Sequence, residues 1–109
     1  MKINVTRNLI DRGNFEECRN DYASNFWNPI SMALRRALLR KIEIVPEKIR
    51  VYFYTETGEI SVDVKTTQAM QEFILCFNTR RWEMLFPFSF DLDIEDIEKQ
   101  AREQIHYKT

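Results

Sequence analysis

Apolar and polar residues alternate along two stretches in the middle of the chain. Apolar side chains occupy every second position from 49 to 53 and again from 60 to 64, with mostly polar side chains between them. A period of two is typical of a strand that buries one face and wets the other. Residues 56–58 separate the stretches and contain Gly58. The pattern therefore predicts a β-hairpin.

Two further stretches, near opposite ends of the sequence, show the same alternation. Residues 2–6 place Ile3 and Val5 on one side, and residues 86–92 alternate phenylalanines and a leucine with polar residues and a proline. Pro87 has no N–H to donate to a ladder, so its strand is expected at a sheet edge or paired on one side there. The sequence thus predicts a small, mainly antiparallel sheet of three to four strands.

Helical spacing is clearest over residues 29–38. Asn28 offers an N-cap and Pro29 suits the first helical position. The apolar face consists of Ile30, Ala33, Leu34, Ala37 and Leu38. At 100° per residue, Met32 and Leu39 fall on the opposite side. Either the aromatic-rich residues 14–27, expected to form an ordered loop, fold over these two side chains, or another chain covers them.

Three other helical segments are expected. Residues 7–11 form a short turn after Thr6, which Gly13 ends in the left-handed conformation. A helix capped by Thr66 or Thr67 runs to about Asn78, followed by a turn over residues 79–84. A last helix begins after Asp93, and its thin apolar stripe either packs lightly on the sheet or docks on another chain. The stripe is Ile94, Ile97, Ala101 and Ile105.

These elements predict an α+β fold over a single domain, residues 1–109. Two to three helices are expected on one face of the sheet. A chain of 109 residues, 44% of them hydrophobic, can bury one core without disulfides or metals.

Charge and hydropathy then indicate which classes of partner the chain is suited to bind. Sixteen basic and seventeen acidic residues leave a formal net charge of −1, which gives no field for duplex nucleic acid or an anionic membrane. No apolar run approaches the ~20 residues of a membrane span. We expect a cytoplasmic protein whose partner is a host or phage protein or a second copy of itself.

Catalytic chemistry has few candidates. Cys18 and Cys76 fit neither a disulfide framework nor a metal motif, and the only histidine, His106, lies in a polar tail. Two glycines cannot form a phosphate-cradling loop. The carboxylates Asp91, Asp93, Glu95 and Asp96 cluster where a helix N-terminus accounts for them. The sequence predicts no enzyme, no cofactor and no metal site.

Two surfaces are candidates for binding. The first is a protein-binding surface on the helix over 29–38 and just beyond it, where apolar residues lie between arginines: Met32, Arg35, Arg36, Leu39 and Arg40. The second would hold a nucleotide-like ligand between subunits: Tyr52, Tyr54, Arg80, Arg81 and Trp82. The alternatives are a solvated basic face and cross-strand packing of the two tyrosines.

Three stretches, "INVTRNLIDRG", "NPISMALRRAL" and "EFILCFNTRRWEMLFPFSFDL", resemble a pattern in small uncharacterised proteins of bacteriophages and mobile elements. Asn28 stands where that pattern has a cysteine. The resemblance implies a phage or mobile-element origin and carries over no functional residue. The resulting hypothesis is a non-enzymatic accessory protein that binds a host protein, such as a defence component. The alternatives are an oligomeric small-ligand binder and a minor virion or assembly component.

Overall fold

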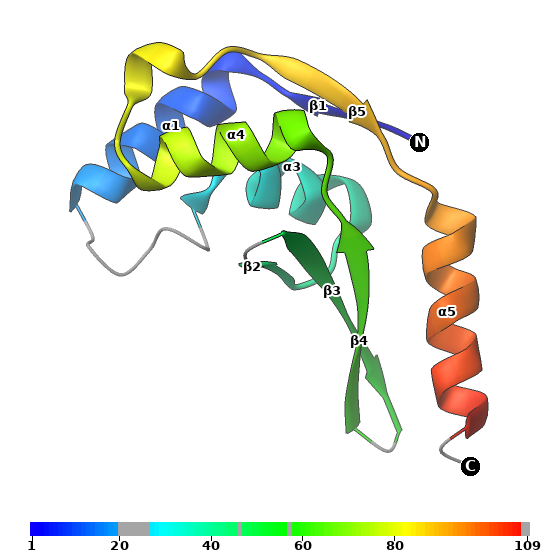
Figure 1. Ribbon diagram of the computed structural model, residues 1–109. Helices are drawn as coiled ribbons and strands as arrows, with labels where there is room; N and C mark the ends of the chain where they lie inside the picture. The colour runs from blue at the N-terminus through cyan, green and yellow to red at the C-terminus, as the bar shows by residue number, and fades with distance from the viewer. Residues whose placement is uncertain (20–26, 46, 57, 108–109) are drawn as a thin grey trace.

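The structure, a computed structural model, describes residues 1–19, 27–45, 47–56 and 58–107 (Figure 1). It contains helices and two small antiparallel sheets, one of two strands and one of three. The predicted α+β class is confirmed. The strands are divided between two sheets instead of forming one, because the first strand pairs with the last and not with the hairpin.

The two-stranded sheet joins β1 (Lys2–Val5) to β5 (Phe88–Asp91). Its register runs from Lys2 opposite Asp91 to Val5 opposite Phe88. The alternation in β1 buries Ile3 and Val5, as the sequence predicts. Strand β5 begins one residue after Pro87, the position that cannot donate a ladder hydrogen bond.

The three-stranded sheet has the order β2 (Ile42–Val45), β3 (Lys48–Thr55), β4 (Gly58–Lys65). The predicted hairpin of β3 and β4 is confirmed. Strand β2 was not predicted; its apolar residues Ile42 and Ile44 are buried on the same side as those of β3. Its four residues give too little alternation to separate a strand from a loop.

The helices are α1 (Arg7–Arg19), α3 (Pro29–Leu38), α4 (Gln68–Asn78) and α5 (Ile94–Tyr107), with a 3₁₀ turn η1 (Trp82–Met84). Three predicted caps are present. Asn28 Oδ1 accepts the amide of Ile30 at 2.9 Å. Thr67 Oγ1 accepts the amide of Met70 at 3.3 Å, and Asp93 Oδ1 accepts that of Asp96 at 3.0 Å. Side-chain caps therefore fix where α3, α4 and α5 begin.

The prediction for residues 7–19 was right at its start and wrong at its end. Residues 7–11 are helical, and Thr6 Oγ1 accepts the amide of Leu9 at 3.3 Å. Helix α1 continues through Gly13 instead of ending there, so residues 14–19 are helical and not a loop; residues 20–26 of the expected loop lie outside the described residues. Gly13 serves close packing. A Cβ at this position would lie 2.7 Å from the carbonyl oxygen of Trp27 and 3.2 Å from the ring of Phe77.

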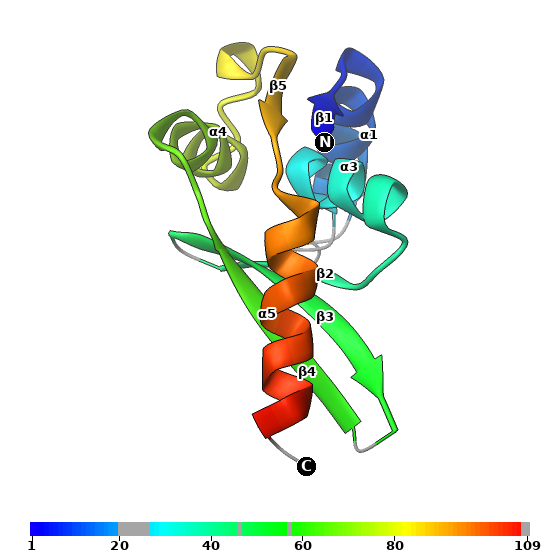
Figure 2. The same ribbon diagram turned by 90° about the vertical axis from the view of Figure 1, so that its right-hand side faces the viewer.

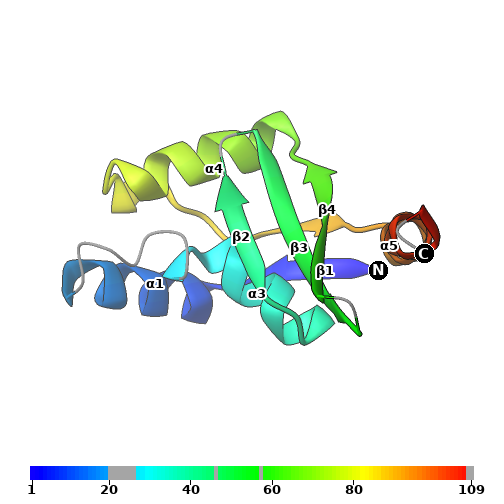
Figure 3. The ribbon, with the colours of Figure 1, turned by 90° about the horizontal axis from the view of Figure 1, so that it is seen from below.

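The molecule is elongated, with principal extents of 48 × 26 × 21 Å. Helices α1, α3 and α4 gather around the β1–β5 sheet, while the β3–β4 hairpin and α5 project together from this body (Figures 1 and 2). Seen from below, the three-stranded sheet lies across α3 and α4 (Figure 3). We call the hairpin and α5 the arm.

Helix α5 packs on the three-stranded sheet. Of the two alternatives for its apolar stripe, packing on the sheet or docking on another chain, the structure shows the first. Ile97 and Ala101 are buried, and Gln104 Nε2 donates to the carbonyl of Ser61 in β4 at 2.8 Å. Among the described residues, no helix has both the length and the apolar character needed to cross a membrane.

Candidate functional site

A groove of about 360 Å³ lies along α3 and forms the first candidate site. We call it the α3 groove. It is lined by Arg12 of α1, by Trp27 ahead of α3, and by residues on and just after α3: Met32, Arg35, Arg36 and Leu39. Four of the five residues predicted for protein binding thus lie together.

Leu39 ends α3 in a conformation that leucine rarely adopts. Its backbone has φ 54 and ψ 40, and its amide donates to the carbonyl of Arg35 at 2.8 Å. A helix end of this geometry usually carries glycine, because a Cβ in the left-handed region costs about 1–2 kcal/mol. The leucine side chain is also 87% exposed. Neither its backbone nor its exposure favours a leucine here in the isolated chain.

Met32 has a different position from Leu39. It is only 6% exposed and forms part of the groove beside Arg12 and Trp27. The prediction that Met32 contacts a partner directly is therefore corrected: the chain itself covers most of this side chain, because α1 extends alongside α3. Of the two residues opposite the main stripe, only Leu39 is presented to solvent.

The rim of the α3 groove is basic. Arg12 Nε lies 3.2 Å from Glu16 Oε1, and its guanidinium stands 5.4 Å from the centre of the Trp27 ring. Partial burial lowers the pKa of Arg35 from the ordinary arginine value. Arg36 is exposed. The groove thus combines an apolar floor with guanidinium groups on its edges.

Arg40 does not line this groove. Its guanidinium lies over the ring of Phe53 in β3, 4.1 Å from the ring centre. The chain reverses direction at Leu39, so the next side chain points toward the sheet. Sequence reasoning missed Arg12 and Trp27. The Arg12–Glu16 spacing was a signal for Arg12, since it is that of a helical ion pair that continues past Gly13.

The second set of predicted residues is not assembled within one chain. Tyr52 and Tyr54 lie on the hairpin. Arg80, Arg81 and Trp82 follow α4, on the part of the body that is far from the hairpin (Figures 1 and 2). A ligand touching both groups would need two copies of the chain.

Several of these side chains also have partners inside the chain. The hydroxyl of Tyr52 donates to Glu43 Oε2 at 2.9 Å, and Lys41 Nζ lies 4.6 Å from the centre of its ring. The ring of Trp82 packs on Phe77 with 5.5 Å between centres. Tyr54, in contrast, is 70% exposed. Cross-strand packing accounts for Tyr52 but not for Tyr54.

The polar face of the hairpin carries a ladder of ion pairs. Asp63 Oδ1 accepts from Arg50 Nε at 3.1 Å, and Asp63 Oδ2 lies 3.1 Å from Lys48 Nζ. Arg50 also lies 3.7 Å from Glu43. The hydrogen bond from Lys48 is the largest cause that holds the pKa of Asp63 below its usual value; burial opposes it, and the hydrogen bond from Arg50 adds to the lowering. The hydrogen bond to Asp63 in turn raises the pKa of Arg50. The charges on this face are therefore largely paired with one another.

Carboxylates at the start of α5 have structural partners. Asp93 caps the helix, and Asp96 Oδ2 accepts from Gln100 Nε2 at 2.7 Å. Within the described part of the chain, no three side chains of the metal-binding types come together. Cys76 is half-buried, and the side chains of Cys18 and His106 lie outside the described residues.

No protein-family model, curated protein or solved structure matches this chain.

Proposed function

We propose that this protein is a non-enzymatic accessory protein of a phage or mobile element, and that it binds a host protein through the α3 groove. The observation that carries the proposal is Leu39: a leucine, 87% exposed, in a left-handed helix end where glycine would serve the fold better. A strained and solvated apolar residue is costly to the isolated chain. A partner surface that buries the side chain would offset this cost.

The chemistry of the groove indicates the kind of partner. Interfaces are enriched in aromatic residues and arginine, which the groove supplies as Trp27 and its guanidinium rim. An apolar side chain flanked by carboxylates would fit beside Leu39 and pair with Arg36. We therefore propose an acidic partner surface with an exposed apolar centre.

The resemblance of three sequence stretches to small phage and mobile-element proteins supports the proposed origin. In that setting, occupation of a functional surface on a host defence protein would make this chain a counter-defence inhibitor. Such a role needs tight contact and no bond-breaking step.

The test compares Leu39→Asn with Leu75→Asn. Asparagine tolerates the left-handed conformation, so Leu39→Asn removes the apolar side chain and keeps the helix end. Leu75 on α4 is also exposed, at 60%, and serves as the matched control. Quantitative capture from host lysate is expected to recover a partner with the wild type and Leu75→Asn, and at least about tenfold less with Leu39→Asn, which corresponds to about 1.4 kcal/mol.

Stability gives an independent measurement on the same residue. Leu39→Gly relieves the left-handed backbone and is expected to raise the free energy of unfolding by about 1 kcal/mol in urea titrations, while it weakens capture. Equal capture by wild type and Leu39→Asn would contradict the proposal. So would a monomeric wild type that captures nothing.

A nucleotide-like ligand held between two copies is the second candidate, favoured by the exposure of Tyr54. Ligand at 100 times its dissociation constant would add about 2.7 kcal/mol to stability. A thermal-shift series with nucleotides therefore separates it from the first proposal, which predicts no response. Mass spectrometry of purified particles would identify a virion component.

A further inference from the structure

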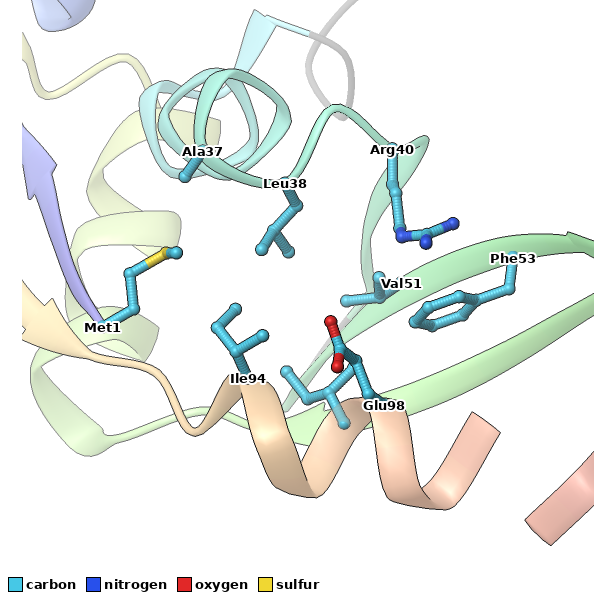
Figure 4. Close-up of a pocket in the computed structure, with 9 residues that line it drawn as sticks. Met1, Ala37, Leu38, Arg40, Val51, Phe53, Ile94 and Glu98 are labelled. Carbon is cyan, nitrogen blue, oxygen red and sulfur yellow. The ribbon is translucent and has the colours of Figure 1, made fainter. Parts of the chain in front are cut away.

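A second concave site lies on the other side of the α3 end, where α3, β3 and α5 meet (Figure 4). Its volume is about 190 Å³. We call it the α3–α5 cleft. Its apolar lining comes mainly from Leu38, Val51, Phe53, Ile94 and Ile97, and its charged residues are Arg40 and Glu98. The cleft shares no lining residue with the α3 groove, and it lies on the apolar side of the hairpin, away from the ion pairs of the polar face.

Arg40 is held in place by its neighbour. Its guanidinium lies over the Phe53 ring at 4.1 Å from the ring centre, a cation–π contact that restrains the position of the group. A planar guanidinium in a fixed position can bind a carboxylate through two parallel hydrogen bonds. Arg40 is therefore suited to an anionic group that enters the cleft.

Glu98 faces the same space from the opposite side. Figure 4 shows its carboxylate directed from α5 toward Val51, between Ile94 and Phe53. In the described part of the chain, Glu98 and Arg40 do not form an ion pair with each other. The cleft thus presents one positive and one negative group on either side of apolar side chains.

We propose that the α3–α5 cleft binds a free α-amino acid with an aliphatic side chain, for which leucine is the probe. The carboxylate of the ligand accepts from Arg40, its ammonium donates to Glu98, and its side chain packs among Leu38, Val51 and Ile94. A simple carboxylic acid would be repelled by Glu98, and a simple amine by Arg40. Only a ligand that carries both charges satisfies both groups.

The size of the cleft points to the same class of ligand. Drug-sized molecules occupy pockets of about 300–1,000 Å³, and this cleft is smaller. An amino acid is a ligand of suitable size, whereas a nucleotide is too large to be enclosed.

The experiment titrates the full chain with L-leucine, N-acetyl-L-leucine and L-leucinamide, followed by calorimetry and by NMR of the methyl groups. The acetylated compound lacks the ammonium and the amide lacks the carboxylate. Leucine is expected to bind at least about tenfold more tightly than either. It should shift the methyl resonances of Leu38 and Ile94.

Two variants assign each charge. Glu98→Gln is expected to weaken leucine about tenfold and leave N-acetyl-leucine unchanged or tighter. Arg40→Gln should weaken leucine similarly without weakening leucinamide. Both residues are exposed, so the variants keep the fold. Glu103→Gln, also an exposed change on α5, is the control and should bind leucine as the wild type does.

Three results would each overturn the assignment. The first is no detectable binding of leucine at a ligand concentration of about 10 mM. The second is leucine binding that neither Glu98→Gln nor Arg40→Gln changes. The third is equal affinity for leucine and its two blocked derivatives.

Discussion

Glycine at position 13 permits close packing between α1 and the rest of the body. Its missing side chain lets α1 approach the carbonyl of Trp27 and the ring of Phe77. In a solvent-exposed helix, alanine would be more stable than glycine by about 1 kcal/mol. At position 13, the backbone carbonyl opposite it cannot move aside as a flexible side chain could.

We therefore expect Gly13→Ala to lower the free energy of unfolding by about 1–3 kcal/mol, the usual cost of overpacking. Urea denaturation measures the change. Asn8→Ala, at an exposed site on the same helix, is the control and should leave stability unchanged or raise it. A stabilised Gly13→Ala would show that α1 packs less closely on the segment before α3.

Leu39 presents the opposite case, a side chain where glycine would fit better. Its position was predictable, because 100° spacing separates it from the main stripe of α3. Its left-handed backbone was not, since no sequence signal marks the end of α3 there. The same spacing grouped Met32 with Leu39 and could not show that α1 covers only Met32.

At the level of elements, local signals were the reliable ones. The caps at Asn28, Thr67 and Asp93 and the pairing of β3 with β4 each depend on residues close together in the sequence. The prediction that α1 ends at Gly13 failed because glycine is used both at helix ends and where elements pack closely. The close approach of Trp27, which distinguishes the two uses, is visible only in the folded structure.

The hairpin illustrates how paired charges stabilise an element. The folded-state pKa of Asp63 is lowered by Lys48 and Arg50, below the unfolded value of about 3.9. The stabilisation is therefore present above that unfolded value and is lost as the pH falls through the folded-state pKa. Because the Asp63 side chain is 42% exposed, the effect is that of a surface pair, about 0.2–1 kcal/mol.

Asp63→Asn is accordingly expected to destabilise the protein by this amount at pH 7, and less and less below about pH 4. Urea titrations at several pH values provide the measurement. The control is Glu59→Gln, since Glu59 has no ion pair within the described residues. A difference between wild type and Asp63→Asn that persists at the lowest pH would exclude the ion pairs as its source.

At the scale of the whole molecule, contacts between α5 and the hairpin hold the arm together. Ile97 and Ala101 cover the apolar side of the hairpin, and Gln104 ties the helix to β4. Only one of the two candidate sites requires α5. The α3–α5 cleft needs α5 in place, whereas the α3 groove is built from α1 and α3 and does not.

Ile97→Ala is expected to cost roughly 2–5 kcal/mol, the usual loss for a buried isoleucine, and to increase hydrogen exchange in α5 first. Ile105→Ala makes the same change on the same helix at a residue that is 40% exposed, so its loss should be clearly smaller. Equal losses, or exchange that rises uniformly through the molecule, would mean that α5 does not open separately from the body.

The pairing of β1 with β5 sets an order of events during synthesis. Lys2 finds its partner in Asp91, so the first strand emerges from the ribosome long before the segment that completes its ladder. Most of the chain must be closed into a loop before this pairing forms, at an entropic cost that grows slowly with loop length. Until then the β1 backbone is an open edge. Maturation of the body must therefore wait for residues that come after the entire arm hairpin, and any pause before Phe88 is translated leaves the N-terminal strand available to other chains.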